Sequence, residues 1–159
     1  MFWTLYQYIF NKNKNEKNNE NKDNKINDSR FYYLSLLKEN TDTGWSIHGL
    51  WPQYDEKNYP VHCKKVVFDY TKLEPILSNL EENWYSNRGT DEDFWKHEWE
   101  KHGSCVFSDI DELQYFSTAL KLFFEAVDKT LPEKYYNPDK NTCLIPVDLN
   151  FNFINDNNN

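Results

Sequence analysis

Three segments of the chain have the apolar pattern of β-strands. Residues 31–37 (FYYLSLL) are rich in aromatic and aliphatic side chains, which favours a buried strand. Residues 45–52 (WSIHGLWP) continue this pattern until glycine and proline interrupt it, so His48 is expected near a strand end. Residues 144–153 (LIPVDLNFNF) alternate between apolar and polar positions and predict the last strand.

Between the second and third of these segments, apolar residues recur at the spacing of amphipathic helices. The face of the first predicted helix consists of Leu73, Ile76, Leu77, Leu80 and Trp84. Thr90 precedes three acidic residues and is expected to cap a second helix, which Gly103 is placed to end. Ser108 and Asp109 are expected to cap a third helix, whose apolar stripe stops at Pro132. Helices grouped between strands favour an α+β domain.

The two ends of the chain differ in composition from its middle. Residues 1–29 begin with an apolar and aromatic stretch that lacks the basic start of a secretory signal and is too short to span a membrane. An Asn- and Lys-rich stretch follows within them and predicts a disordered segment. The Asn-rich tail, residues 155–159, is expected to be disordered as well. Residues 30–154 are therefore the expected compact domain.

Composition narrows the classes of function. The 159 residues carry a formal net charge of -8, which argues against binding nucleic acid through a broad basic face. A nuclease is still allowed, because an enzyme that engages one phosphodiester at a time needs only a local cluster of positive groups. Aromatic residues make up 18% of the chain, so we expect an aromatic core.

The chain has three cysteines, Cys63, Cys105 and Cys143, which allow one disulfide and leave one thiol over. No pair has the CxxC spacing of a zinc ribbon or a thioredoxin-type site. Counting alone leaves both an oxidised and a reduced protein open.

Four ionisable residues of the second predicted helix share one side of it. Each residue of an α-helix turns by about 100°, and at that angle less than half of the circumference holds His97, Glu98, Lys101 and His102. Trp99 points to the other side and is the expected anchor in the core.

Two other interpretations of this helix have to be weighed. The letters HEWEKH resemble the HExxH zinc motif, but that motif needs histidines four residues apart, whereas His97 and His102 are five apart and Lys101 occupies the ligand position. A solvated polar face, with i,i+4 pairs from His97 to Lys101 and from Glu98 to His102, stays open on this segment alone.

Two longer motifs carry a resemblance to a known family. The sequence reads WSIHGLWPQY at 45–54 and FWKHEWEKHGSC at 94–105. These resemble the two signatures of the ribonuclease T2 family of acid endoribonucleases, an HGLWP box and an FWxHEWxKHGTC box, with Ser104 as the one change in the second box. The resemblance implies that family's fold, a single α+β domain with a central antiparallel sheet flanked by helices.

The resemblance also implies a reaction. The family cleaves single-stranded RNA without a metal or other cofactor, through a 2′,3′-cyclic phosphate to 3′-phosphate products. Two imidazoles in opposite protonation states can carry out both proton transfers near their ordinary pKa of about 6.5. In the family pattern His102 is the base and His48 the acid, although the spacing alone does not order them. Lys101 would neutralise charge on the phosphate. Glu98 would orient His102 or bind the phosphorane, and His97 would contact phosphate.

Three further residues correspond by position to the base-recognition groups of the family: Trp51, Gln53 and Tyr59. An aromatic ring stacks on any base, so low base specificity is expected, although Trp51 and Tyr59 are also compatible with ordinary core aromatics. Many relatives have Asp where Gln53 stands, which leaves the base preference open. The family pattern further pairs Cys63 with Cys105 and leaves Cys143 without a partner.

The resemblance implies partners and a compartment too. The expected partner is single-stranded RNA, bound by a monomer, with no role for DNA, which lacks the 2′-OH nucleophile, and none for a membrane. A disulfide and the family suggest a secreted protein or one of the endolysosomal lumen. The alternative is a catalytically weak or inactive member that acts as an RNA-binding or toxin-like protein, because cysteines that relatives carry are missing here.

Overall fold

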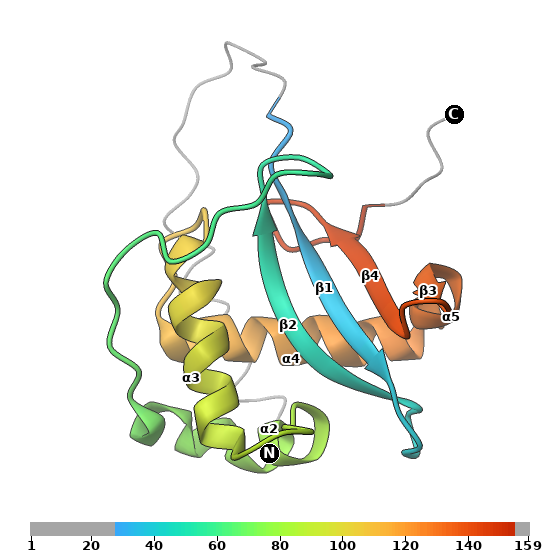
Figure 1. Ribbon diagram of the computed structural model, residues 1–159, viewed down its shortest axis with the longest axis horizontal. Helices are drawn as coiled ribbons and strands as arrows, with labels where there is room; N and C mark the ends of the chain where they lie inside the picture. Colours follow the sequence, from blue (N-terminus) through green and yellow to red (C-terminus); the bar gives the residue numbers. More distant parts are fainter. Residues whose placement is uncertain (1–27, 155–159) are drawn as a thin grey trace.

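The computed structural model describes residues 28–154, which form a curved antiparallel sheet with helices around it (Figure 1). The strands lie in the order β2-β1-β4-β3. Their bounds are β1 (Phe31–Lys38), β2 (Trp45–Gln53), β3 (Tyr136–Asn137) and β4 (Thr142–Val147). The expected α+β class with a central antiparallel sheet is confirmed.

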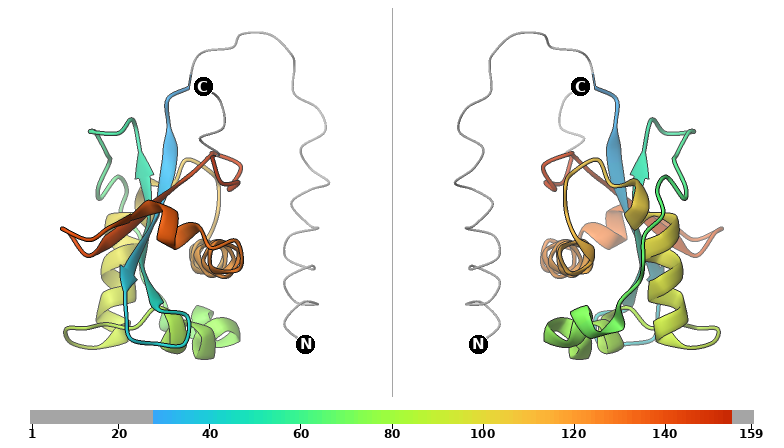
Figure 2. Two further views of the ribbon diagram at one scale, coloured as in Figure 1. Left: turned by 90° about the vertical axis from the view of Figure 1, so that its right-hand side faces the viewer. Right: turned by 90° about the vertical axis from the view of Figure 1, so that its left-hand side faces the viewer.

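The helices lie around the sheet. Their bounds are η1 (Tyr70–Ile76), α2 (Leu77–Asn83), α3 (Asp91–Lys101), η2 (Gly103–Cys105), α4 (Glu112–Asp128) and α5 (Leu131–Tyr135), where η denotes a 3-10 helix. Figure 2 shows α4 end-on against one side of the sheet. The α3 helix runs beside the β2 edge of the sheet (Figure 1).

The main core lies between the sheet and α4, and aromatic rings fill much of it, as the composition predicts. Its largest fully buried side chains include Trp45, Trp84, Trp95, Tyr32, Tyr115, Phe116 and Phe123. Cys143 of β4 is a free, fully buried cysteine whose Sγ donates to the carbonyl oxygen of Pro132 at 3.5 Å. Burial raises the pKa of this thiol to about 12.

The second strand continues where the sequence pattern predicted a break. It runs through Gly49 and Pro52 to Gln53, so His48 lies in the middle of the strand and not near its end. Proline is tolerated because β2 is an edge strand and needs ladder hydrogen bonds on one side only. The strand does have an irregularity, a β-bulge, and it falls at His48: Ser35 is opposite Gly49 and Leu36 is opposite Ile47.

The first predicted helix is divided into two parts. Its apolar residues fall on η1 and on the short α2, because Pro75 lies inside η1 and prevents a regular α-helix there. The face itself is predicted well, since Leu73, Leu80 and Trp84 are fully buried.

The second and third helices begin at caps of the expected kind. The Thr90 hydroxyl accepts from the backbone N–H of Asp93, which confirms the cap of α3. For α4 the predicted cap is wrong by two residues or more. Asp111 caps this helix, because Gln114 completes a reciprocal capping box with it and neither Ser108 nor Asp109 has such a partner.

The end of α3 lies where the sequence predicts it, and the end of α4 does not. The α3 helix ends at Lys101 with His102 as its C-cap, so Gly103 follows directly, but it opens η2 without a positive φ. A glycine is needed there for another reason, since a Cβ would collide with the ring of Trp99. Pro132 does not stop the third helix, which already ends at Asp128. It lies in the first turn of α5, where proline is well accommodated.

The expectations for residues 1–29 and for the tail fall on residues that lie outside the described part of the chain, namely 1–27 and 155–159, except for Asp28 and Ser29. Within residues 28–154, no helix is long and apolar enough to cross a membrane.

Candidate active site

His48 owes its position to the bulge in β2. An extra residue in one strand turns its side chain away from the regular alternation and is often found beside active sites. The Trp84 indole N–H donates to the carbonyl oxygen of His48 at 3.1 Å, which fixes the backbone at this point. The imidazole is half-buried, and its Nδ1 has no hydrogen-bond partner among the described residues.

The ionisable side of α3 faces the bulge because tryptophans fix the rotation of this helix. Trp95 and Trp99 are buried, and the Trp99 ring lies 5.5 Å from that of Tyr115 on α4. Trp99 is thus the core anchor that the helical angles predict. On the side toward β2, Glu98 and His102 are buried, with exposed fractions of 2% and 5%. Lys101 is half-buried and His97 is exposed.

Trp51 connects the two elements. Its ring centroid lies 5.0 Å from that of His48 and 5.3 Å from that of His102, on which it stacks at 28°. Its indole N–H donates to Glu98 Oε2 at 2.9 Å. Gly49 allows this approach, because a Cβ there would collide with both Glu98 Oε2 and Trp51 Nε1. The structure therefore brings His48 and His102 together around one tryptophan.

Burial and nearby positive groups lower the pKa of the imidazoles of the site. Burial, followed by the charge of Lys101, lowers the pKa of His102 to about 3. The same two causes lower the pKa of the half-buried His48, and partial desolvation together with the charge of Lys101 lowers that of His97, whose side chain is largely exposed. Because these groups are crowded together, an anion placed among them would favour their charged forms.

Glu98 is shifted in the opposite direction. Burial raises its pKa to about 7, although the hydrogen bond from Trp51 lowers it. The carboxyl group is therefore largely protonated at mildly acidic pH. Its hydrogen-bond partner is Trp51 and not His102, whose Nδ1 has no hydrogen-bond partner among residues 28–154.

The predicted base-binding residues are separated in the structure. Trp51 lies inside the cluster just described. Gln53 is buried, with 5% of its surface exposed, and its side-chain amide donates to the carbonyl oxygen of Trp51 at 3.4 Å. Tyr59 lies in the loop after β2 and is 59% exposed. No contact between Tyr59 and the histidines occurs among the ring contacts of the described part of the chain.

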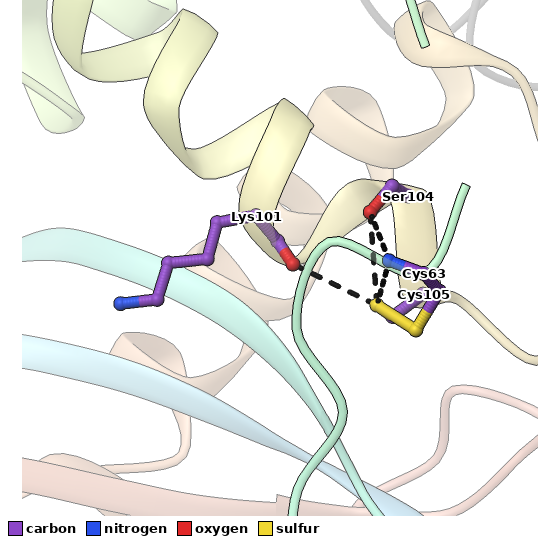
Figure 3. The surroundings of a disulfide bond; sticks show 4 residues. All are labelled: Cys63, Lys101, Ser104 and Cys105. Atoms are coloured by element: carbon purple, nitrogen blue, oxygen red, sulfur yellow. Dashed lines mark hydrogen bonds between the residues drawn. A yellow bond between two sulfur atoms is a disulfide. The ribbon is translucent and has the colours of Figure 1, made fainter. Parts of the chain in front are cut away.

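A disulfide between Cys63 and Cys105 confirms the expected pairing and joins the loop after β2 to η2 (Figure 3). The Cys63 backbone N–H donates to Ser104 Oγ at 3.2 Å, and the Lys101 carbonyl oxygen accepts from His62 N–H at 2.9 Å. Figure 3 shows the Lys101 side chain pointing away from the disulfide. The loop is thus fixed to the end of α3 on the side away from the Lys101 amino group.

Sequence reasoning missed three residues of the site. His62 is close enough to be one of the charges that lower the pKa of His97 and His102. The Phe94 ring lies 5.9 Å from His48, and Gly49 makes room for Glu98. The motif letters contained Phe94 and Gly49, but nothing in the helical spacing predicts His62, because the disulfide brings it to the site. Among residues 28–154, no three His, Cys, Asp or Glu side chains are grouped so that they could hold a metal ion.

Comparison with known proteins identifies related sequences and folds. The chain is 43% identical over 94 residues to Ribonuclease 1 of Arabidopsis thaliana, a match that covers 57% of this chain and 40% of the relative. It is 35% identical over 119 residues to Ribonuclease DdI of Dictyostelium discoideum, covering 72% of this chain and 53% of the relative. The chain thus spans about half the length of these relatives or less. Other relatives are named as an intracellular and an extracellular ribonuclease, both of Solanum lycopersicum.

Solved structures share the fold. A ribonuclease-related protein from Calystegia sepium superposes with a TM-score of 0.62 at 18% identity, over 80% of this chain and 90% of that one. RNase NT in complex with 5′-AMP superposes with a TM-score of 0.57 at 24% identity, over 79% and 88% of the two chains. A sequence model described as the Ribonuclease T2 family matches residues 6–145, which is most of the chain. This chain belongs to the ribonuclease T2 family.

Proposed function

We propose that the protein is a metal-independent endoribonuclease that cleaves single-stranded RNA by transesterification, through a 2′,3′-cyclic phosphate to 3′-phosphate products. The observation that carries the proposal is the contact of both His48 and His102 with the ring of Trp51, with Lys101 close enough to act on their pKa values. Transesterification needs one group to take the 2′-OH proton and another to protonate the 5′-oxygen, and two adjacent imidazoles can do both. The names of the relatives and the 5′-AMP bound to RNase NT support the choice of RNA.

His102 is the proposed base and His48 the proposed acid. The low pKa of His102 keeps it unprotonated in mildly acidic solution, as a base must be. The bound phosphate would raise the pKa of His48 and let it carry the proton for the leaving oxygen. Lys101 and His97 would neutralise the developing charge of the phosphorane. Glu98, protonated at this pH, would donate a hydrogen bond to it.

Base specificity is proposed to be low. Trp51 and Tyr59 are aromatic residues, and stacking does not distinguish bases well. The buried amide of Gln53 would act by holding the backbone of Trp51, with which it forms its hydrogen bond. The protein is further proposed to act as a monomer on RNA alone, not on DNA or membranes. Its disulfide supports an extracellular or endolysosomal compartment.

The test is cleavage of the dinucleoside phosphate UpU in mildly acidic buffer with EDTA. We expect release of uridine 2′,3′-cyclic phosphate, and His48→Ala and His102→Ala should each lower kcat by about 10²- to 10⁴-fold. The Lys140→Ala variant, at the opposite edge of the sheet, is the control and should keep the wild-type rate. Cleavage that EDTA abolishes would contradict the proposal. So would a folded protein that binds UpU but forms no cyclic product.

A further inference from the structure

The loop that carries His62 is attached to the end of α3 at two neighbouring residues. The backbone N–H of His62 donates to the carbonyl oxygen of Lys101 at 2.9 Å. The next residue, Cys63, is bonded to Cys105 and donates to Ser104 Oγ at 3.2 Å. The backbone of His62 is therefore held in place while its imidazole is exposed to solvent.

The conformation of His62 is unusual for a side chain of its size. Its φ is 51°, in the left-handed region that most residues avoid and that Asn, Asp and His adopt more readily than others. The hydrogen bond to Lys101 and the disulfide of Cys63 hold His62 in this conformation. Residues held in this way are concentrated at binding and catalytic sites.

The surroundings of His62 are rich in basic side chains, although the chain as a whole carries a formal net charge of -8. The groups of α3 near it are His97, Lys101 and His102, and His62 adds to the charges that lower the pKa of His97 and of His102. Of the acidic residues on the same helix, Glu100 acts on His97 in the opposite direction, and Glu98 is buried in the site. Lys64 and Lys65 follow directly. Within the described part of the chain, no carboxylate forms an ion pair with His62, Lys64 or Lys65.

We propose that His62 forms a second phosphate subsite, which binds the phosphate of an RNA chain next to the one that is cleaved. The inference rests on the proposed function, because that function places the scissile phosphate among His48, Lys101 and His102. An RNA chain that continues past this point toward the loop meets an exposed imidazole and then two lysines. A protonated imidazole binds phosphate as a charged hydrogen-bond donor. The subsite would therefore favour oligonucleotides over dinucleoside phosphates.

The experiment compares UpU with the same dinucleotide carrying an additional 5′- or 3′-terminal phosphate. The variants are His62→Asn and His62→Asp, since both new residues adopt the left-handed conformation and so keep the loop. The readout is the ratio of kcat/KM for the phosphorylated dinucleotide to kcat/KM for UpU in each protein, because any effect of His62 on the pKa of His97 and His102 acts on both substrates and cancels in this ratio. The gain from the additional phosphate should fall about tenfold in His62→Asn, the value of one charged hydrogen bond, and further in His62→Asp.

A longer oligouridylate gives a second readout. Loss of one phosphate contact should reduce the slope of log binding constant against log salt concentration by about 0.7 for a single strand. Lys140→Asn is the matched control, since it removes a positive charge at the opposite edge of the sheet. An equal effect of Lys140→Asn and His62→Asn would overturn the proposal. Equal losses for UpU and for its phosphorylated forms would do the same.

Binding of 2′-deoxy analogues separates this proposal from the function on which it rests. These analogues cannot be cleaved, so their binding can be measured by calorimetry whether or not the protein is active. If the phosphorylated analogue binds in a His62-dependent way and UpU is not cleaved, the subsite stands and the proposed function fails. If UpU is cleaved and the His62 variants bind the phosphorylated analogue as tightly as the wild type does, only the proposed subsite fails.

Discussion

Trp51 contacts three ionisable side chains at once. Its ring lies beside His48 and stacks on His102, and its N–H donates to Glu98. The hydrogen bond acts against the burial that raises the pKa of Glu98. One side chain thus contacts both imidazoles and also lowers the pKa of the Glu98 carboxyl group.

Replacing Trp51 by Phe separates these two roles. The ring remains, but Glu98 loses its donor, so we expect its pKa to rise further above about 7 and the free energy of unfolding to fall by about 0.5–1.5 kcal/mol. NMR of labelled glutamate carboxyls across a pH series measures the first effect. Trp45→Phe is the control, because that indole donates to Glu133 of α5 at 3.3 Å and not to Glu98. An unchanged Glu98 titration in Trp51→Phe would contradict the prediction.

The sequence predicts some of these residue contacts and not others, for a physical reason. His97, Glu98, Lys101 and His102 belong to one helix, so a fixed angle per residue is enough to group them. The contact between Trp51 and Glu98 joins residues 47 apart in the chain, and no local rule predicts it. The position of His62 is even harder to predict from the sequence, because it depends on a disulfide that was inferred only from the family pattern.

At the scale of elements, the site is a junction between an irregular strand and the end of a helix. The bulge in β2 presents His48, and α3 presents its last turn. Gly49 sets how closely the two elements approach, since any side chain there would displace the Glu98 carboxyl and the Trp51 indole. The predicted break at this glycine was wrong because the residue serves a close approach and not a turn.

Gly49→Ala should therefore lower activity more than stability. A displacement of about 1 Å in a catalytic arrangement can lower the rate about 10²-fold, and we expect a loss of that order in kcat for UpU. Gly89→Ala is a useful contrast, because Gly89 has a φ of 85° and a Cβ added to it would meet nothing within 4 Å. That variant should lose about 1–2 kcal/mol of stability and keep its kcat. The reverse pattern in thermal unfolding and kinetics would refute the role given to Gly49.

The disulfide is the second connection between elements. It closes a loop across a sequence separation of 42, and its removal in the Cys63→Ala, Cys105→Ala double variant should lower the free energy of unfolding by about 2–5 kcal/mol. Urea unfolding measures this. A reductant should destabilise the wild type by a similar amount and leave the double variant unchanged. If the reductant destabilises both proteins equally, the effect does not come from this bond.

At the scale of the whole molecule, pH changes the stability through two buried groups whose pKa values are shifted in opposite directions. Glu98 has a folded pKa of about 7 against 4.5 unperturbed, so the folded state binds the extra proton between these values and loses stability as pH rises through them. His102 has a folded pKa of about 3 against 6.5, so it loses stability as pH falls from 6.5 toward 3. The lowered pKa values of His48 and His97 also reduce the stability as pH falls.

Glu98→Gln isolates one of these contributions. Glutamine can still accept from Trp51 but does not ionise, so the variant should gain stability relative to wild type as pH rises from about 4.5 to about 7, with the difference constant above that. His102→Gln should show the opposite trend and gain relative to wild type as pH falls below 6.5. Urea unfolding at half-unit pH intervals gives both differences. A pH-independent difference for Glu98→Gln would show that its carboxyl is not buried as described.

The fully buried thiol of Cys143 offers a way to time the opening of the sheet. Thiol reagents attack the thiolate, and both burial and a pKa of about 12 keep that form rare in the folded protein. With Cys63 and Cys105 joined, the remaining thiol can be labelled only in molecules whose β4 has separated from β1 and α5. When closing is faster than labelling, the labelling rate reports the fraction of such open molecules. Labelling of this single cysteine thus measures local unfolding at β4, a strand distant in sequence from both His48 and His102.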